Sequence, residues 1–192
     1  MSFTFTRHSQ LPDVIIVDSN QHEDHRGFFG ETYREDEFVA AGIPKFVQEN
    51  RSHSKAYTVR GLHYQLNPRA QGKLVSCVSG SILDVAVDIR RGSPTFGQSV
   101  SVALSGGVGR MLYIPAGFAH GFIVDAGYPY VAEVVYKVTE YFDAGLDRVI
   151  RWDDPELNVS WGLLMGDRDK LRLSYKDRNA PLLRDAEVNY EY

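Results

Sequence analysis

The chain has 192 residues, of which 43% are hydrophobic, 12% aromatic and 24% charged, a composition that supports a folded core and excludes disordered and fibrous classes. Its 21 basic and 25 acidic residues give a net charge of −4, which excludes the basic footprint of a nucleic-acid-binding protein. The longest aliphatic run, residues 14–17, is far shorter than the roughly 18 apolar residues of a membrane span. We expect one domain over residues 1–192, with neither nucleic acid nor a membrane as partner.

Cysteine usage and the first residues bear on the cell compartment. Cys77 is the only cysteine, which excludes an internal disulfide, and it falls in an apolar run over residues 74–78 where a thiol is expected to be buried and inert. Residues 1–7 carry no basic leader followed by an apolar stretch. Both features predict a cytoplasmic protein.

In chain order, the first regular element that the sequence predicts is a short helix over residues 35–41. Acidic residues occupy its first turn, Gly42 stands at the position of a C-terminal cap, and Pro44 follows. From about residue 46 to residue 138, short runs of β-branched and aromatic residues then recur, as in strands. A second short helix is expected in the tail, over residues 181–187.

Two of the runs alternate with the period of a strand that has one wet face. Residues 83–89 place aliphatic side chains at the odd positions and Asp84 and Asp88 between them, so the two carboxylates are expected to face solvent. Residues 98–104 alternate valine or leucine with serine or alanine in the same way.

A third run, residues 130–138, places Tyr136 on the same face as three small or aliphatic side chains, while Glu133 and Lys137 lie on the other face. Tyr136 should therefore point inward. Turn signals separate the runs, at residues 79–80, 91–94, 105–107 and 125–127.

Many short strands at nearly regular spacing, with helices only at the margins, predict an all-β fold. The expected architecture is a jelly-roll barrel of two antiparallel sheets. Its core should span about residues 46–138, with N-terminal strands within residues 1–45 and C-terminal strands and a short helix within residues 139–192.

Residues 109–120 carry a motif of this fold class: a glycine, five residues, Pro-x-Gly, two residues and His120. The spacing resembles the second motif of the cupin superfamily, which consists of small jelly-roll barrels. In metal-binding cupins that histidine joins a His-x-His pair and a glutamate, but here residues 63–65 read His-Tyr-Gln and the acid is missing. Two imidazoles are too few for a tight site, so we expect no metal.

Cationic and proton-transfer side chains are expected on or beside strands of one barrel: Arg60, His63, Lys73, His120 and Tyr136. Such a cluster suits an anionic or enolate-forming ligand. Each member also has an ordinary alternative role, as a hydrogen-bonded structural histidine, a packed tyrosine or a loop lysine. Strict alternation sets Arg60 and His63 on opposite faces, so a bulge or strong twist is required if both line a pocket.

Further stretches, which follow one another along nearly the whole chain, carry a more specific resemblance: residues 24–31, 48–52, 59–65, 71–75, 83–90, 115–122, 136–141, 152–155 and 173–177. In these stretches the chain resembles the dTDP-4-dehydrorhamnose 3,5-epimerase family, from about residue 12 to residue 183. The sequence Arg-Gly-Leu-His-Tyr-Gln at residues 60–65 is the specific part.

The resemblance implies an enzyme that epimerises dTDP-4-dehydro-6-deoxy-D-glucose at C3 and C5 to dTDP-4-dehydro-L-rhamnose. The C4 ketone makes both protons acidic because their loss gives an enolate, so no cofactor is needed. It implies His63 as the base and Asp177 as the partner that orients it. It also implies Tyr136 as the acid on the opposite sugar face and Lys73 beside the enolate oxygen.

For the rest of the substrate, the family pattern implies Arg26 on the diphosphate and Phe29 on the thymine, from a stretch that a homodimer partner is expected to contribute. Further substrate contacts are implied for Glu31, Gln48, Asn50, Arg60, His120, Tyr141, Asp147 and Lys176. Two departures stand out: Phe142 replaces a second tyrosine of many members, and the stretch over residues 125–133 is longer than usual.

Other functions remain open from the sequence. An epimerase acting on one carbon only, or on another deoxysugar, would use the same residues. A ketoisomerase would move the carbonyl from C4 to C3. A non-catalytic sugar-binding cupin and a metal-dependent cupin enzyme are the remaining alternatives.

Overall fold

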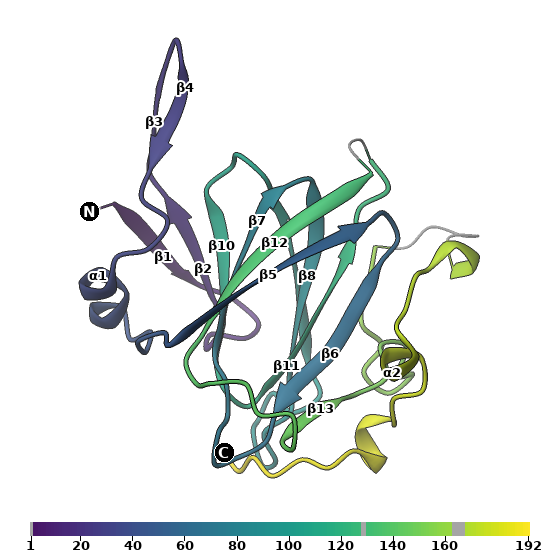
Figure 1. Cartoon of the computed structure of the whole chain (residues 1–192). Helices are drawn as coiled ribbons and strands as arrows, with labels where there is room; N and C mark the ends of the chain where they lie inside the picture. The colour runs from purple at the N-terminus through teal and green to yellow at the C-terminus, as the bar shows by residue number, and fades with distance from the viewer. Residues whose placement is uncertain (1, 128–129, 163–167) are drawn as a thin grey trace.

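The computed structural model describes residues 2–127, 130–162 and 168–192, and shows two antiparallel sheets (Figure 1). In spatial order, the six-stranded sheet contains β1 (Phe3–Arg7), β2 (Ile15–Ser19), β10 (Arg110–Ile114), β7 (Lys73–Ser79), β12 (Val131–Val138) and β5 (Gln48–Lys55). The five-stranded sheet contains β13 (Asp147–Val149), β6 (Val59–Gln65), β11 (Phe118–Val124), β8 (Ser81–Asp88) and β9 (Ser99–Ser105). This confirms the predicted all-β jelly roll.

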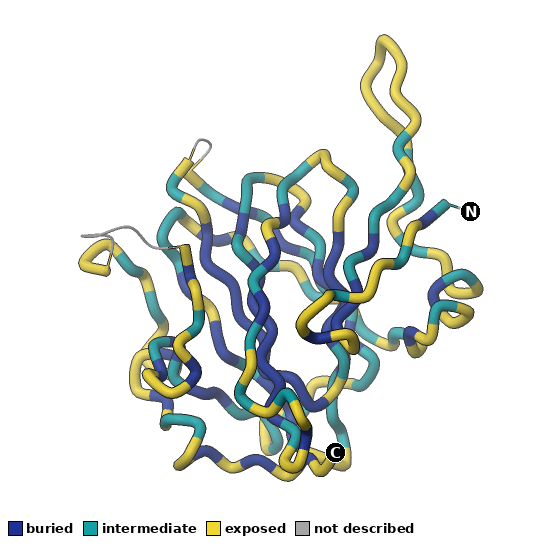
Figure 2. Tube along the Cα trace, turned by 180° about the vertical axis from the view of Figure 1, so that it is seen from behind, coloured by how far each residue is buried: buried dark blue, intermediate teal, exposed yellow. Residues whose placement is uncertain are grey.

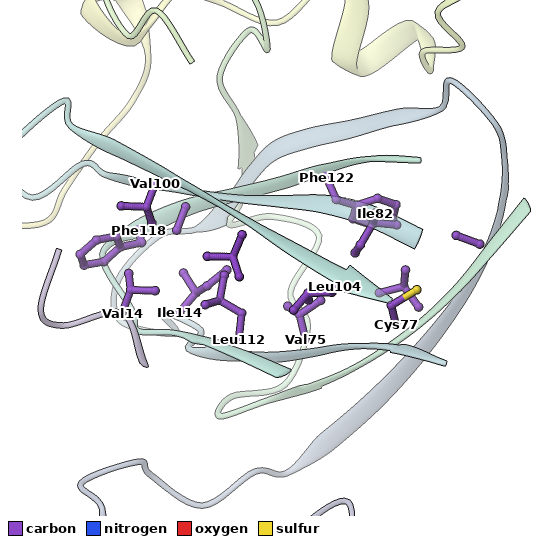
Figure 3. Close-up of a cluster of buried hydrophobic side chains, with 14 of the residues drawn as sticks. Val14, Val75, Cys77, Ile82, Val100, Leu104, Leu112, Ile114, Phe118 and Phe122 are labelled. Atoms are coloured by element: carbon purple, nitrogen blue, oxygen red, sulfur yellow. The ribbon is translucent and has the colours of Figure 1, made fainter. Parts of the chain in front are cut away.

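The central core lies between the inner faces of the two sheets (Figure 3). Val75 and Leu112 come from the six-stranded sheet, and Ile82, Leu104 and Phe122 come from the five-stranded sheet. Their burial is the main favourable term that holds the sheets together. The free thiol of Cys77 belongs to this core, as expected, and burial raises its pKa.

The outer face of the five-stranded sheet is also covered. The C-terminal segment, green to yellow in Figure 1, covers it with the indoles of Trp152 and Trp161 and the ring of Tyr190, which share one buried cluster with Val85 and Val87 of β8. Strand β8 is therefore buried on both faces, so the expectation that its carboxylates face solvent was wrong. The odd, aliphatic positions of β8 pack against this outer layer, so the even positions, which carry the two carboxylates beside Ile82 and Ala86, face the space between the sheets.

Asp84 and Asp88 are each fully buried and each has a polar partner. Asp84 lies 2.7 Å from His120, and Asp88 accepts hydrogen bonds from Arg90, Ser93 and Thr95.

The outer face of the six-stranded sheet is covered near its β1 edge by α1 (Glu35–Ala40), the helix expected over residues 35–41. Phe38 is its one buried residue and meets Phe3, Phe5 and Tyr33 in edge-on ring contacts. The tail expected to be helical over residues 181–187 contains only a single 3-10 turn at Leu183–Asp185.

A hairpin formed by β3 (Gln21–Asp24) and β4 (Gly27–Gly30) projects from the barrel, with all of residues 22–29 exposed (Figure 2). Within the described ranges, no helix has the length and apolarity needed to cross a membrane. Of the long connection expected over residues 125–133, residues 128–129 lie outside the described residues.

Strands β6 and β11 pair with an irregular register. His120 lies opposite His63 and Phe122 opposite Arg60, so two residues of β6, Gly61 and Leu62, face the single Gly121 of β11. The extra residue returns Arg60 and His63 to the same side of the strand. This is the bulge that the sequence called for if both residues were to line one pocket. Gly61 has φ = 132°, and a Cβ atom there would lie 2.5 Å from Cα of Gly121.

This close approach predicts that Gly61→Ala costs more stability than a matched glycine variant. Gly27 has nearly the same φ, 126°, but nothing within 4 Å of a Cβ atom, so Gly27→Ala reports backbone strain alone, of about 1–3 kcal/mol. Gly61→Ala should lose at least about 2 kcal/mol more, because backbone must move. Urea unfolding of both variants measures the difference. An equal loss in the free energy of unfolding for the two variants would show that β6 and β11 can move apart to make room for the methyl group.

Candidate active site

Side chains from both sheets and from α2 (Tyr175–Arg178) surround a pocket of about 470 Å³. Its lining includes ten residues singled out from the sequence or its departures: Gln48, Asn50, Arg60, His63, Lys73, His120, Tyr136, Phe142, Asp147 and Asp177. Two other pockets have a comparable size, and none of their described lining residues is a histidine. The predicted catalytic side chains thus meet in one place.

His63 lies on β6 with its Nε2 2.8 Å from Oδ1 of Asp177. Asp177 is a buried residue of α2, and Ser174 caps that helix: the Ser174 hydroxyl donates to Oδ2 of Asp177 at 2.7 Å and accepts from its backbone N–H. Burial works to raise the pKa of Asp177, but the contacts with His63, Ser174 and the backbone of Gly61 outweigh it and leave the pKa lowered. The carboxylate is therefore charged beside His63, and it lies at the Nε2 end of the imidazole ring.

Lys73, the first residue of β7, is buried and connects the two sheets. Its ammonium group donates to the backbone carbonyl of His63 at 3.1 Å. Burial lowers the pKa of Lys73 to about 8, and Asp147 and Asp84 oppose that shift. Lys73 therefore carries its charge at neutral pH in a water-poor place, where a charge acts strongly on a developing anion.

His120 on β11 contacts Asp84 on β8, with Nε2 2.7 Å from Oδ1. Burial raises the pKa of Asp84 against the effects of His120 and Lys73, and it lowers the pKa of His120 against the effect of Asp84. The other carboxylate oxygen, Oδ2, is buried without a hydrogen-bond partner in the described part of the chain. The pair fixes the orientation of the His120 ring.

Tyr136 lies on β12, in the sheet opposite His63, and both line the pocket. Its inward direction was predicted, and its ring packs against the central core. Burial raises the pKa of Tyr136, although Arg60 acts to lower it, so the phenol keeps its proton well above neutral pH. A phenol and an imidazole thus line the same pocket from the two sheets.

Polar side chains extend from this centre toward the mouth. Arg60 donates through Nε to the buried hydroxyl of Ser54 at 2.9 Å, and Nε2 of Gln48 donates to Oδ1 of Asn50 at 2.9 Å. Asp147 on β13 lines the pocket and pairs with Lys176 of α2.

Other predicted substrate contacts lie outside this pocket lining: Arg26, Phe29, Glu31, Tyr141 and Lys176. Arg26 and Phe29 are on the projecting hairpin, where Arg26 pairs with Asp24 and the Phe29 side chain is 73% exposed. At the rim, Phe142 lines the pocket while Tyr141 does not. Within one subunit the hairpin is thus separate from the pocket.

The structure adds residues that sequence reasoning missed, chiefly Ser174, Gln71 and Asp84. The sequence could have identified Ser174, since a serine three residues before Asp177 fits a helix-capping pattern. Asp84 had none, because nothing local to β8 shows that the strand faces His120. No group of three His, Cys, Asp or Glu residues that could hold a metal lies together in the described ranges.

Comparison with known proteins identifies the family to which this chain is similar. The family model of dTDP-4-dehydrorhamnose 3,5-epimerase matches residues 8–185. An enzyme of that name from Pseudomonas aeruginosa is 48% identical over 179 residues, which cover 92% of this chain and 94% of the relative.

Two solved structures share the fold. The dTDP-6-deoxy-D-glucose-3,5-epimerase of Legionella pneumophila, in complex with dTDP-4-keto-L-rhamnose, is 39% identical with a TM-score of 0.90, covering 99% of this chain and 98% of that chain. A 3'-monoepimerase variant from Streptomyces bikiniensis, in complex with dTDP, is 29% identical with a TM-score of 0.84, covering 93% and 87%. From the family match and the high coverage of its relatives, the chain belongs to the dTDP-4-dehydrorhamnose 3,5-epimerase family.

Proposed function

We propose that the protein epimerises dTDP-4-dehydro-6-deoxy-D-glucose at C3 and C5, giving dTDP-4-dehydro-L-rhamnose. The observation that carries the proposal is one pocket in which His63, paired with a buried carboxylate, and Tyr136 approach from opposite sheets, with buried Lys73 between the sheets. Family membership and the ligand of the Legionella pneumophila enzyme support the substrate class.

The chemistry needs a base, an acid and a partner for an oxyanion. In each half-reaction Nδ1 of His63 takes the proton from the carbon next to the C4 ketone, and the electron pair moves onto the C4 oxygen as an enolate. Lys73 stabilises that oxygen, whose charge grows in the transition state. The Tyr136 hydroxyl then returns a proton to the carbon from the other face as the carbonyl re-forms, which inverts the centre. Before the next half-reaction, solvent takes the proton from the His63 imidazolium and gives one to the Tyr136 phenolate, which restores both groups.

Asp177 stabilises the imidazolium that forms when His63 takes the proton and holds the ring in place. In this proposal His120 and Arg60 contact the sugar and the phosphates, and the hydrogen bonds that hold them, to Asp84 and Ser54 respectively, support the assignment. Gln48, Asn50, Asp147 and Lys176 supply further polar contacts with the substrate. The reaction as written moves only protons, so it calls for no cofactor.

For the nucleotide end we propose a homodimer in which the hairpin of one subunit reaches the pocket of the other. Within one subunit Arg26, Phe29 and Glu31 lie outside the pocket, and the Phe29 ring is largely exposed, which suits residues that act across an interface. Arg26 would then bind the diphosphate, Phe29 would stack on the thymine, and Glu31 and Tyr141 would add contacts. The homodimer and the cytoplasmic location stay predictions.

A second candidate is epimerisation at one carbon only, which the likeness to the Streptomyces bikiniensis 3'-monoepimerase favours. The same His63 and Tyr136 would perform one inversion instead of two. The two candidates differ in the number of product carbons that exchange hydrogen with solvent.

Solvent exchange tests the reaction and both proton-transfer roles. With the 4-keto substrate in deuterated water, we expect NMR to show deuterium at C3 and C5 of the product. His63→Ala should abolish exchange and turnover because no base remains, a loss of at least ~10²-fold. Tyr136→Phe should still exchange but fail to invert. One labelled carbon would support the single-carbon epimerase, and near-normal turnover by His63→Ala would remove the assigned base.

The lowered pKa of Lys73 predicts an alkaline limit to activity. Below about pH 8 the ammonium is charged and stabilises the enolate, so kcat should fall as pH rises through about 8. Tyr136 keeps its proton in this range, since burial raises its pKa above the ordinary value of 10. Lys73→Met should lower kcat by ~10²-fold. Lys73→Arg should keep the charge and move the fall to higher pH, whereas an unchanged profile would exclude Lys73 as its source.

Mixed dimers test whether the hairpin crosses between subunits. Arg26→Ala and His63→Ala homodimers should each be inactive or nearly so. If hairpins cross, each heterodimer holds one intact site, so equal co-expression should recover about a quarter of wild-type activity. No recovery in verified heterodimers would show that each hairpin serves its own chain.

A further inference from the structure

The connection between β12 and β13 is held by a set of side-chain amides. Residues 140–143 have no helical or strand structure, yet each has a backbone group bonded to a glutamine. Gln71 donates to the carbonyl of Glu140 at 2.8 Å, and Gln65 donates to the carbonyl of Tyr141 at 3.0 Å. Gln48 accepts from the N–H of Phe142 at 3.1 Å, and Gln65 also accepts from the N–H of Asp143 at 2.8 Å.

We call Gln48, Gln65 and Gln71 the glutamine clamp. They come from β5, from β6 and from the link before β7, so three separate parts of the barrel converge on one short segment. Backbone groups of an irregular segment need partners when they are shielded from water, and the clamp supplies them. The segment is thereby fixed relative to both sheets.

Gln65 is the most constrained member, with a side chain that is 2% exposed. Its Nε2 donates to two carbonyls, those of Tyr141 and Arg69, and its Oε1 accepts one N–H. Both donors of the amide are therefore used inside the protein. In the position where a metal-binding cupin has its second imidazole, this chain has a residue that holds a loop.

The clamped segment presents two aromatic rings at the mouth of the pocket. Tyr141 is 56% exposed and Phe142 is 55% exposed, and Phe142 lines the pocket. Aromatic rings that are fixed in this way offer a flat surface for a planar ligand such as a nucleobase. A surface that is already in its binding position avoids the entropy cost of ordering it during binding.

We propose that Gln65 and Gln71 are positioning residues that hold the rings of Tyr141 and Phe142 as one wall of the nucleotide end of the site. The inference rests on the proposed function and adds to it how affinity for the nucleoside diphosphate is set. The hydrogen bonds described above join Gln48, Gln65 and Gln71 to the backbone of residues 140–143, and none of them involves His63 or Tyr136. The effect of the clamp falls on binding of the nucleotide and leaves proton transfer unchanged.

The test replaces Gln65 and Gln71 by methionine, which keeps the length of glutamine and removes its hydrogen bonds. Gln65→Met and Gln71→Met should raise the Kd for dTDP, measured by calorimetry, and the KM for the 4-keto substrate by about tenfold, with kcat within about twofold. Gln98→Met is the control, since Gln98 is exposed and lies outside the pocket lining, and it should change neither constant. Gln71 is only partly buried, so its variant keeps the test valid if Gln65→Met fails to fold.

A double-mutant cycle separates positioning from a general structural role. In a chain that also carries Tyr141→Ala and Phe142→Ala, Gln71→Met should change the Kd by less than about twofold, because the rings through which it acts are gone. A full tenfold effect in that background would overturn the proposal, as would an unchanged Kd or a fall in kcat at constant KM. Failure of the wild type to bind dTDP or to exchange substrate protons would instead overturn the proposed function.

Discussion

The close approach of β6 and β11 is the constraint on which the site depends. Gly61 and Leu62 face the single Gly121, and only a residue without Cβ fits against Gly121 at this distance. The resulting shift in register turns Arg60 and His63 to the same side. With regular pairing one of the two would point into the outer apolar layer.

A second constraint is the burial of charge between the sheets. Lys73, Asp84, His120 and Asp177 are all buried. Burial disfavours the charged form of each group, which lowers the pKa of Lys73 and His120 and raises that of Asp84. The groups offset that cost by pairing: Lys73 with a carbonyl, His120 with Asp84, and Asp177 with His63 and Ser174. A site built in this way is electrostatically organised before any ligand arrives.

The site divides along the pocket into two parts with different construction. The inner part consists of side chains on strands, whose positions follow from the register of the sheets. The rim consists of irregular backbone, which three glutamine amides hold in place. Strand pairing fixes the backbone that carries the inner side chains, whereas the rim has no strand pairing and is held by hydrogen bonds from side chains.

The sequence by itself determined the fold class, the strands over residues 98–104 and 130–138, the helix at residues 35–41 and the inward face of Tyr136. These follow from local periodicity and turn chemistry, which act within a few residues. It also showed, from the alternation in β6, that a bulge was needed for Arg60 and His63 to share a pocket.

Only the tertiary structure decided which groups meet. Asp84 was expected in solvent and is buried against His120, because the aliphatic face of β8 packs under the C-terminal segment and the face with Asp84 turns toward the space between the sheets. Gln65, Gln71 and Gln48 are separated in sequence from residues 140–143 and contact them only once both sheets have formed. Contacts between distant segments depend on which strands pair and which layers pack together. The periodicity of a single strand does not specify its neighbours.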